Sequence, residues 1–167
     1  DVRRARLVAG EDALVIGGGP AVHSGLTGRK TSIDTYGEYA RHSGAALSGK
    51  GPLRIDRVGA YMARYAAKNL VAAGLARECE VQLSYAVGAA DPVSLRVRSF
   101  GSSEFGDAEL TRRLREAMDF RIGAIVRDLR LQRLPAEHSD GFYRRLAVYG
   151  HMGRSDLDPP WELTDKA

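Results

Sequence analysis

The clearest pattern of apolar and polar positions along the chain is helical and extends over about residues 57–75. Apolar side chains recur there at steps of three and four, whereas the charged side chains of Arg57, Arg64 and Lys68 lie mostly off that stripe. The stripe consists of Val58, Tyr61, Met62, Tyr65, Ala66, Leu70 and Ala73. The pattern predicts an amphipathic helix that places its tyrosines in the core and ends near Gly74.

Two segments with alternating polarity follow this helix. Residues Glu80–Val87 and Val93–Phe100 each place apolar side chains at every second position, which is typical of a half-buried strand. The short turn between them, Gly88–Pro92, contains glycine and proline. The sequence therefore predicts an antiparallel hairpin.

Four further segments have shorter patterns. Residues Ala13–Ile16 and Thr31–Thr35 are short runs next to glycine turns and predict strands. Asp107–Phe120 and Ile122–Leu131 have helical spacing and predict helices. Residues 132–167 are polar with scattered aromatic side chains, and no element is predicted there.

The predicted order is strand, strand, helix, hairpin, helix. This order predicts an α+β fold with two layers, in which helices cover one face of a mostly antiparallel sheet. Residues 1–12 are predicted to be a lead-in segment, and residues 13–167 a single domain, as expected for a chain of 167 residues.

Composition excludes several functional classes. No apolar run approaches the roughly 20 residues of a transmembrane helix, so a membrane partner is not expected. The net charge is only +4, and basic side chains alternate with acidic ones without a Lys/Arg block, so nucleic acid is not expected as a partner either. A single cysteine, Cys79, excludes an internal disulfide and favours a reducing, cytoplasmic location.

Cations on glycine-rich turns are the most informative chemical feature. They occur in the segments Thr27–Lys30 and Ser48–Arg54. Phosphates are bound by fixed cations and by backbone N–H groups, and the second segment leads into the N-terminus of the predicted helix, beside Lys50. The adjacent side chains of Arg29 and Lys30 reach one anion only if the turn before them is irregular. From the residues alone, two interpretations stay open: solvated surface cations and a phosphate site.

Candidate metal ligands are few. Asp34 and Asp56 are suited to Mg²⁺ accompanying a phosphate, because Mg²⁺ takes one or two carboxylates together with phosphate oxygens. Asp56 is explained equally well as a first-turn residue that complements the helix dipole. The spacing of the histidines and the single cysteine do not fit structural zinc. The glycines of Gly17-Gly18-Gly19 match neither nucleotide-loop motif and predict a tight turn.

Read in order, these and further segments resemble the C-terminal third of methionine adenosyltransferases, also called S-adenosylmethionine synthetases. The resemblance covers nearly all of the chain from Leu14 onward. The matching strings are VIGG (15–18), GLTGRK (25–30), IDTYG (33–37), ARHSGAALSGK (40–50), DRVGAYMARYAAKNLVAAGLA (56–76), CEVQLSYAVGAADPVSLRV (79–97), RIGAIVRDL (121–129), YGHMGR (149–154) and PWELTDKA (160–167).

The resemblance implies a fold of three similar, intertwined α+β domains, with active sites between two subunits. It implies a reaction in which the methionine sulfur attacks C5′ of ATP, and the released triphosphate is cleaved to phosphate and pyrophosphate. Mg²⁺ and K⁺ are the implied cofactors. Arg29, Lys30 and Lys50 would hold the triphosphate, and Ala46 would lie against the nucleotide.

Three departures affect the methionine and adenine half of the implied site. His23 stands where the family has an Asp, Arg54 stands where it has a Lys, and Ala13-Leu14 replaces an Arg-Phe pair. Arg for Lys keeps the charge but changes the geometry, whereas His for Asp removes or reverses it.

Family chains are also much longer, and their N-terminal third supplies the catalytic His and several carboxylates. We therefore expect this chain to be part of a methionine adenosyltransferase that acts on ATP and methionine. Its N-terminal part would come from a partner chain, in a homo- or hetero-oligomer, or is absent from this sequence. The alternatives are a non-catalytic nucleotide- or polyphosphate-binding regulatory module and a relative with an altered substrate.

Overall fold

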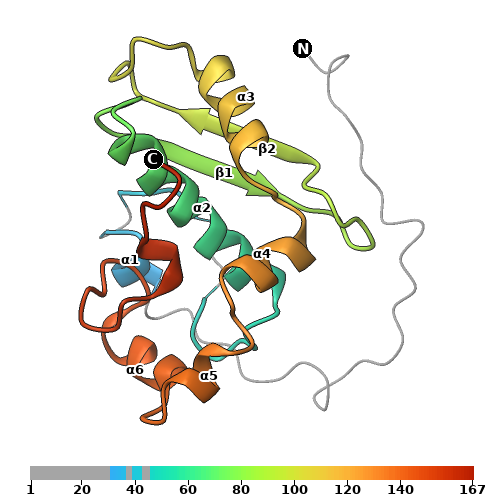
Figure 1. Ribbon diagram of the computed structural model, residues 1–167, viewed down its shortest axis with the longest axis vertical. Coiled ribbons are helices and arrows are strands. Elements are labelled where there is room, and N and C mark those ends of the chain that lie inside the picture. Colours follow the sequence, from blue (N-terminus) through green and yellow to red (C-terminus); the bar gives the residue numbers. More distant parts are fainter. Residues whose placement is uncertain (1–30, 37–38, 43–45) are drawn as a thin grey trace.

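The computed structural model describes residues 31–36, 39–42 and 46–167, and Figure 1 shows the arrangement of their elements. The helices are α1 (Thr31–Asp34), α2 (Ile55–Ala72), α3 (Asp107–Ala117), α4 (Ile122–Asp128), α5 (Leu134–Glu137) and α6 (Phe142–Tyr149). The strands are β1 (Glu80–Ser84) and β2 (Ser94–Arg98), and a 3-10 turn, η2, covers Pro160–Glu162. The predicted strand Ala13–Ile16 and the predicted boundary between lead-in and domain lie outside the described residues, so both stay predictions.

Helix α2 is the central element, and it confirms the strongest sequence pattern. Its buried face contains the predicted stripe from Val58 to Leu70, including both tyrosines. Gly74 follows the helix with φ +71°, which a glycine adopts without strain. The amide of Gly74 bonds to the carbonyl of Val71, and the amide of Leu75 to that of Leu70, so the last turn is closed by a Schellman motif.

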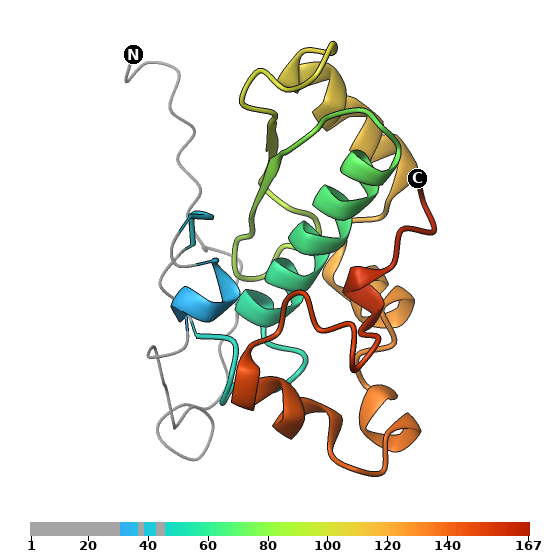
Figure 2. The ribbon, with the colours of Figure 1, turned by 90° about the vertical axis from the view of Figure 1, so that its left-hand side faces the viewer.

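The predicted hairpin is confirmed, with shorter strands than the alternation indicated. Strand β1 pairs antiparallel with β2, so that Val81 faces Val97 and Leu83 faces Leu95. In Figure 2, where the two strands are seen nearly edge-on, α2 and α3 lie on the same side of them. The described residues therefore form an α+β fold with helices on one face of an antiparallel pair, as predicted.

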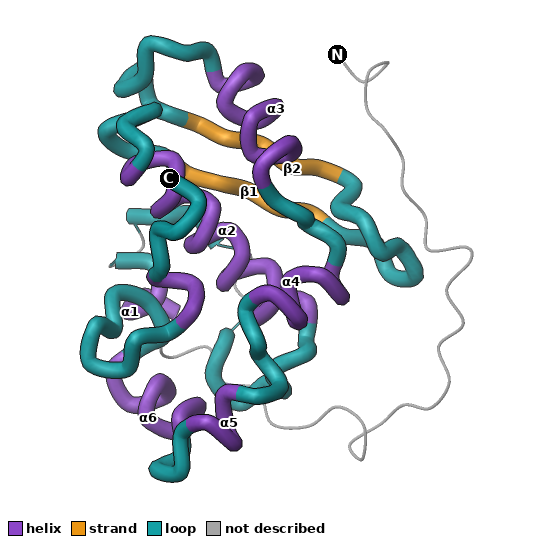
Figure 3. The backbone as a smooth tube through the Cα atoms, viewed as in Figure 1, coloured by secondary structure: helices purple, strands orange, loops and turns teal. Residues whose placement is uncertain are grey.

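Two predictions from short patterns were wrong. Thr31–Thr35 was predicted as a strand, but residues Thr31–Asp34 form the helical turn α1. No element is predicted for residues 132–167, but they contain α5 and α6, which Figure 3 shows as short helices, and the 3-10 turn η2. Elements of this length have little local signal, and their tertiary contacts decide their conformation.

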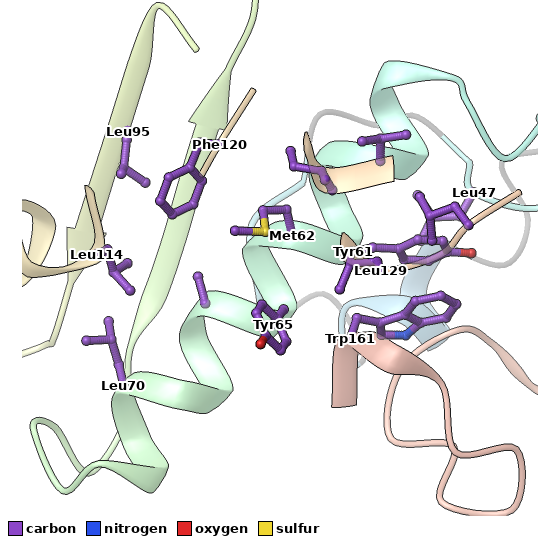
Figure 4. Close-up of a cluster of buried hydrophobic side chains, with 14 of the residues drawn as sticks. Leu47, Tyr61, Met62, Tyr65, Leu70, Leu95, Leu114, Phe120, Leu129 and Trp161 are labelled. Atoms are coloured by element: carbon purple, nitrogen blue, oxygen red, sulfur yellow. The ribbon is translucent and has the colours of Figure 1, made fainter. Parts of the chain in front are cut away.

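One hydrophobic core joins α2, the hairpin and the C-terminal segment. Figure 4 shows Leu95 and Phe120 at one end of this core and Tyr61 with Trp161 at the other. The rings of Tyr61 and Trp161 are parallel, with centroids 3.6 Å apart, and both residues are fully buried. Trp161 thus fixes the C-terminal segment to the first half of α2.

Hydrogen bonds and ion pairs reinforce the same contact. Arg64 of α2 donates to both carboxylate oxygens of Glu162 at 2.9 and 2.8 Å, and Lys68 lies 3.0 Å from Glu162 Oε2. The amide of Lys166 donates to Asn69 Oδ1 at 2.7 Å.

Within the described residues, no helix has the length and apolar character needed to cross a membrane.

Candidate functional site

The second predicted cation segment lies against the start of α2. Ala46, Leu47 and Ser48 are buried, whereas Gly49 is exposed and has φ +82°, so the chain reverses there at a residue that tolerates this conformation. The amide of Lys50 closes the turn on the carbonyl of Leu47 at 3.4 Å. Ala46 is 7% exposed, and its predicted contact with a nucleotide stays a prediction.

Lys50 and Asp56, which the sequence singled out separately, meet in the structure. Lys50 Nζ lies 2.8 Å from Asp56 Oδ2. The side chain of Lys50 is only 8% exposed, whereas that of Asp56 is 40% exposed. The lysine is therefore a largely buried cation whose partner faces the solvent.

Asp56 satisfies one of its two predicted roles directly. It lies in the first turn of α2, where a carboxylate complements the helix dipole. Its metal role stays a prediction. Among the described residues, no three His, Cys, Asp or Glu side chains gather closely enough to hold a metal ion. A site at Asp56 would therefore have to be of the kind in which phosphate oxygens supply most ligands, which suits Mg²⁺.

The N-terminus of α2 completes the electrostatic setting of Lys50. Arg54 is the N-cap residue, is exposed, and provides no side-chain cap, whereas its carbonyl accepts from the amides of Arg57 and Val58. Because Lys50 Nζ contacts Asp56 in the first turn of this 18-residue helix, the ammonium lies near the positive end of the helix dipole. A lysine ammonium next to a helix N-terminus is an arrangement that favours anions.

Arg57 departs from the sequence prediction. The helical pattern placed it off the apolar stripe, but it is 4% exposed. Its Nε donates to the hydroxyl of Tyr61 at 2.8 Å, its Nη1 donates to the carbonyl of Lys50 at 2.5 Å, and its guanidinium lies 4.4 Å from the ring centroid of Tyr143. A buried arginine is stable only with such partners, and here one of them is the backbone of the candidate site.

His151, which the sequence did not single out, is the centre of the buried polar contacts. Its Nε2 lies 2.8 Å from Ser48 Oγ, and its Nδ1 lies 2.7 Å from the hydroxyl of Tyr61. Its carbonyl accepts from Trp161 Nε1 at 2.7 Å. Burial, reinforced by the charges of Arg57 and Arg154, lowers the pKa of His151 to about 3, so the imidazole is neutral near pH 7.

Helix α1 packs on the segment that carries His151. Asp34 Oδ1 accepts from the backbone N–H of His151 at 2.5 Å. Burial raises the pKa of Asp34, although this hydrogen bond and the charge of Arg57 act in the opposite direction. Asp34, which the sequence offered as a metal ligand, has a structural contact here, and its metal role is untested.

The remaining predicted site residues lie outside the described residues. These are Arg29 and Lys30 of the first cation segment and His23 at the altered methionine position. Their gathering around one anion with Lys50 therefore stays a prediction. Of the predicted set, the structure brings together Lys50 and Asp56 and places Arg54 at the entrance to α2.

Most of this chain matches known proteins. The family model described as the S-adenosylmethionine synthetase C-terminal domain matches residues 16–163. The chain is 54% identical over 164 residues to the S-adenosylmethionine synthase of Gloeobacter violaceus. It is 55% identical over 150 residues to that of Synechococcus elongatus, and 57% identical over 145 residues to that of Synechococcus sp. strain RCC307.

The chain belongs to the S-adenosylmethionine synthetase family. The match to the Gloeobacter synthase covers 98% of this chain but only 39% of the relative, and the two Synechococcus matches each cover 36% of the relative. The resemblance predicted from the motifs is thus confirmed, and the chain spans about two fifths of the length of these S-adenosylmethionine synthases. The segment with Lys50 and the buried contacts of His151 lie inside the family match.

Proposed function

We propose that this chain is the C-terminal part of a methionine adenosyltransferase, which forms S-adenosylmethionine from ATP and methionine and releases phosphate and pyrophosphate. The observation that supports this most strongly is Lys50, a largely buried cation beside the N-terminus of α2, in a chain of the S-adenosylmethionine synthetase family. The chain would contribute the phosphate half of the active site.

The chemistry of the reaction explains why such a lysine is needed. When the methionine sulfur displaces triphosphate from C5′, negative charge develops on the leaving oxygens. A cation already held in place lowers the energy of that transition state without reorganising. Lys50 is preorganised by Asp56, and its ammonium has three N–H donors, so it can contact a phosphate oxygen while it keeps the carboxylate.

Two cations are part of the proposal. Asp56 would hold Mg²⁺ together with phosphate oxygens, and a Mg²⁺ bound there would neutralise charge on the triphosphate. The exposed carboxylate beside a phosphate-binding lysine fits that role. K⁺ is carried over from the family resemblance alone, and no residue is assigned to it.

The rest of the active site would come from the part of the family's length that this chain does not span. That part would be supplied by a partner chain or by the same polypeptide, in a homo- or hetero-oligomer. A cytoplasmic location is proposed on the basis of the single cysteine.

Calorimetric titration with inorganic triphosphate and with ATP tests the phosphate half directly. A charge-assisted hydrogen bond contributes about 1.5–3 kcal/mol, so Lys50→Ala should weaken triphosphate binding by roughly 10–100-fold. Lys166→Ala removes the same charge from an exposed position near the end of the chain and should leave the affinity unchanged. Equal losses in both variants would show that only net charge matters and would remove Lys50 from the site.

The complete activity is tested by adding the N-terminal part of a related synthase. The assembled protein should release phosphate and pyrophosphate only when both ATP and methionine are present. Absence of turnover in a folded assembly that still binds triphosphate would refute the transferase function and leave phosphate binding intact.

A second candidate, a non-catalytic polyphosphate-binding module, is favoured by the substitutions at His23 and Ala13-Leu14. These positions affect the methionine and adenine half, whereas Lys50 of the phosphate half is retained. An inactive assembly that gains turnover on His23→Asp would support this second candidate. An active assembly without that change would refute it.

A further inference from the structure

A closed ring of side-chain and backbone contacts surrounds the turn that carries Lys50. The carbonyl of Lys50 accepts from Arg57, which also donates to Tyr61. The hydroxyl of Tyr61 contacts one ring nitrogen of His151, and the other ring nitrogen contacts Ser48. Ser48 and Lys50 are separated by one residue, so the ring closes through the backbone of the turn itself.

The two bonds from Arg57 have a fixed direction, and the need of the buried Tyr61 proton for an acceptor orients the others. The Nε of Arg57 can only donate, so the hydroxyl of Tyr61 accepts there, and its own buried proton gains an acceptor if it points to Nδ1 of His151, the other polar atom that this hydroxyl contacts. A neutral imidazole that accepts at Nδ1 carries its proton on Nε2, which then donates to Ser48 Oγ. The geometry thus assigns the Nε2–H tautomer to His151.

The turn needs this support because its own backbone bonds are weak. Among the described residues, the backbone hydrogen bond that closes its reversal at Gly49 is a long one of 3.4 Å, from the amide of Lys50 to the carbonyl of Leu47. His151 and Arg57 hold the turn on the two sides of Gly49, and both are nearly or fully buried. The burial makes each bond costly to lose, because an unpaired group would not regain a water partner.

We propose that His151 is a positioning residue for Lys50: through Ser48 and Tyr61 it holds the turn that places the lysine ammonium beside the N-terminus of α2. This inference rests on the proposed phosphate role of Lys50 and assigns to the histidine of the YGHMGR segment the task of orienting that cation. His151 does not contact the phosphate. Its imidazole acts through Ser48 and Tyr61, the two residues that its ring nitrogens contact.

The first test needs no ligand and measures the reactivity of the Lys50 amine toward an acylating ester, followed by mass spectrometry. In the parent chain the amine is largely buried and paired with Asp56, so acylation should be slow. His151→Asn keeps an acceptor toward Tyr61 but is too short to reach Ser48, and it should raise the rate at Lys50 by about fivefold, the effect of one lost hydrogen bond. His151→Gln keeps a donor toward Ser48 and should raise it less.

Two other lysines serve as internal references in the same sample. Lys68, paired with Glu162, reports on the fold, and Lys166 reports on the reagent. Both rates should stay constant. If His151→Asn does not fold, Ser48→Ala removes the same contact from the other side and should give the same increase at Lys50. An unchanged Lys50 rate in the folded variants would overturn the proposal.

The second test asks whether His151 acts through Lys50. His151→Asn should weaken triphosphate binding by about five- to tenfold in the parent chain and should have no effect in the Lys50→Ala background. A purely structural role would lower the affinity equally in both backgrounds and would refute positioning. If Lys50 reactivity responds as expected but the parent chain binds no triphosphate, the proposed function fails while the positioning of the turn stands.

Discussion

The buried, neutral His151 predicts a specific loss of stability when the pH falls from 7 to 5. The pKa of His151 is lowered to about 3 in the folded chain from an ordinary value of 6.5. Between pH 6.5 and 3, the imidazole of His151 therefore binds a proton in the unfolded chain but not in the folded chain. The stabilisation is complete above pH 6.5 and is lost progressively as the pH falls toward 3.

The size of the effect follows from the two pKa values. At pH 7 most unfolded molecules carry a neutral histidine at this position, whereas at pH 5 nearly all carry a protonated one. Linkage then gives a loss of about 2 kcal/mol in the free energy of unfolding between pH 7 and 5. The position is 0% exposed, so screening by solvent does not reduce this figure appreciably.

Urea unfolding of the parent chain and of His151→Gln, at half-unit steps from pH 7 to 5, isolates this contribution. His151→Gln should be less stable than the parent chain at pH 7. Between pH 7 and 5, however, its free energy of unfolding should fall by about 2 kcal/mol less than that of the parent, because glutamine does not titrate. Val148→Ala, at an exposed position without a titrating group, is the control and should retain the parental slope. Equal slopes for the parent and His151→Gln would refute the assignment of a buried neutral imidazole.

Two further predictions concern stability and use the same assay. Gly150→Ala should lower the free energy of unfolding by about 3 kcal/mol, because φ is +91° and the added Cβ would overlap a methyl carbon of Ile33. Gly153→Ala is the control and should lower it by only about 1 kcal/mol, because φ is +67° there but the Cβ position is open. Equal costs would show that packing against α1 is loose. Glu162→Gln should cost about 2 kcal/mol, because it removes the charge that two half-buried cations share, whereas Glu116→Gln, in an exposed pair, should change little.

Acid should weaken the Glu162 contact in the parent chain as well. Burial raises the pKa of Glu162, but hydrogen bonds and charge from Arg64, the amide of Gly153 and Lys68 prevail and hold it below 4.5. The contact therefore stabilises the fold above pH 4.5 and is lost as the pH falls through the lowered pKa.

The elements predicted best are those whose local pattern and tertiary role agree. Helix α2 repeats its apolar stripe over 18 residues, and the hairpin alternates on both strands, so neither assignment depends on distant contacts. Helix α1 is the opposite case. Four residues have no usable period, and the contact that the structure gives them, a hydrogen bond between Asp34 and His151, joins residues 117 positions apart.

The residues of the candidate site also differ in how far the sequence predicted their contacts. Lys50 and Asp56 are six positions apart, and a cation before a helix N-terminus followed by a first-turn acid is visible in the sequence. Ser48 and His151 are 103 positions apart. Ser48 begins the predicted cation segment, whereas no cation-rich or glycine-rich pattern marks the surroundings of His151 as part of a site. The sequence drew attention to that histidine only because the string YGHMGR resembles a family segment. The string alone did not indicate which residues His151 contacts.

Arg57 shows a limit of hydrophobic periodicity. A charged side chain between apolar positions is assigned to solvent by the pattern, and most such side chains are solvated. Here Tyr61 and the carbonyl of Lys50 accept from the guanidinium, and Tyr143 stacks with it. Hydrophobic periodicity describes the polarity of residues along one helix. It contains no information on residues of other segments that contact a buried charged side chain.

The most direct measurement is a crystal structure of the chain with inorganic triphosphate and Mg²⁺. Phosphate oxygens are expected within hydrogen-bond distance of Lys50 Nζ, close to the first turn of α2, with Arg29 and Lys30 turned toward the same anion. Triphosphate bound elsewhere, or three cations directed to separate faces of the molecule, would contradict this expectation.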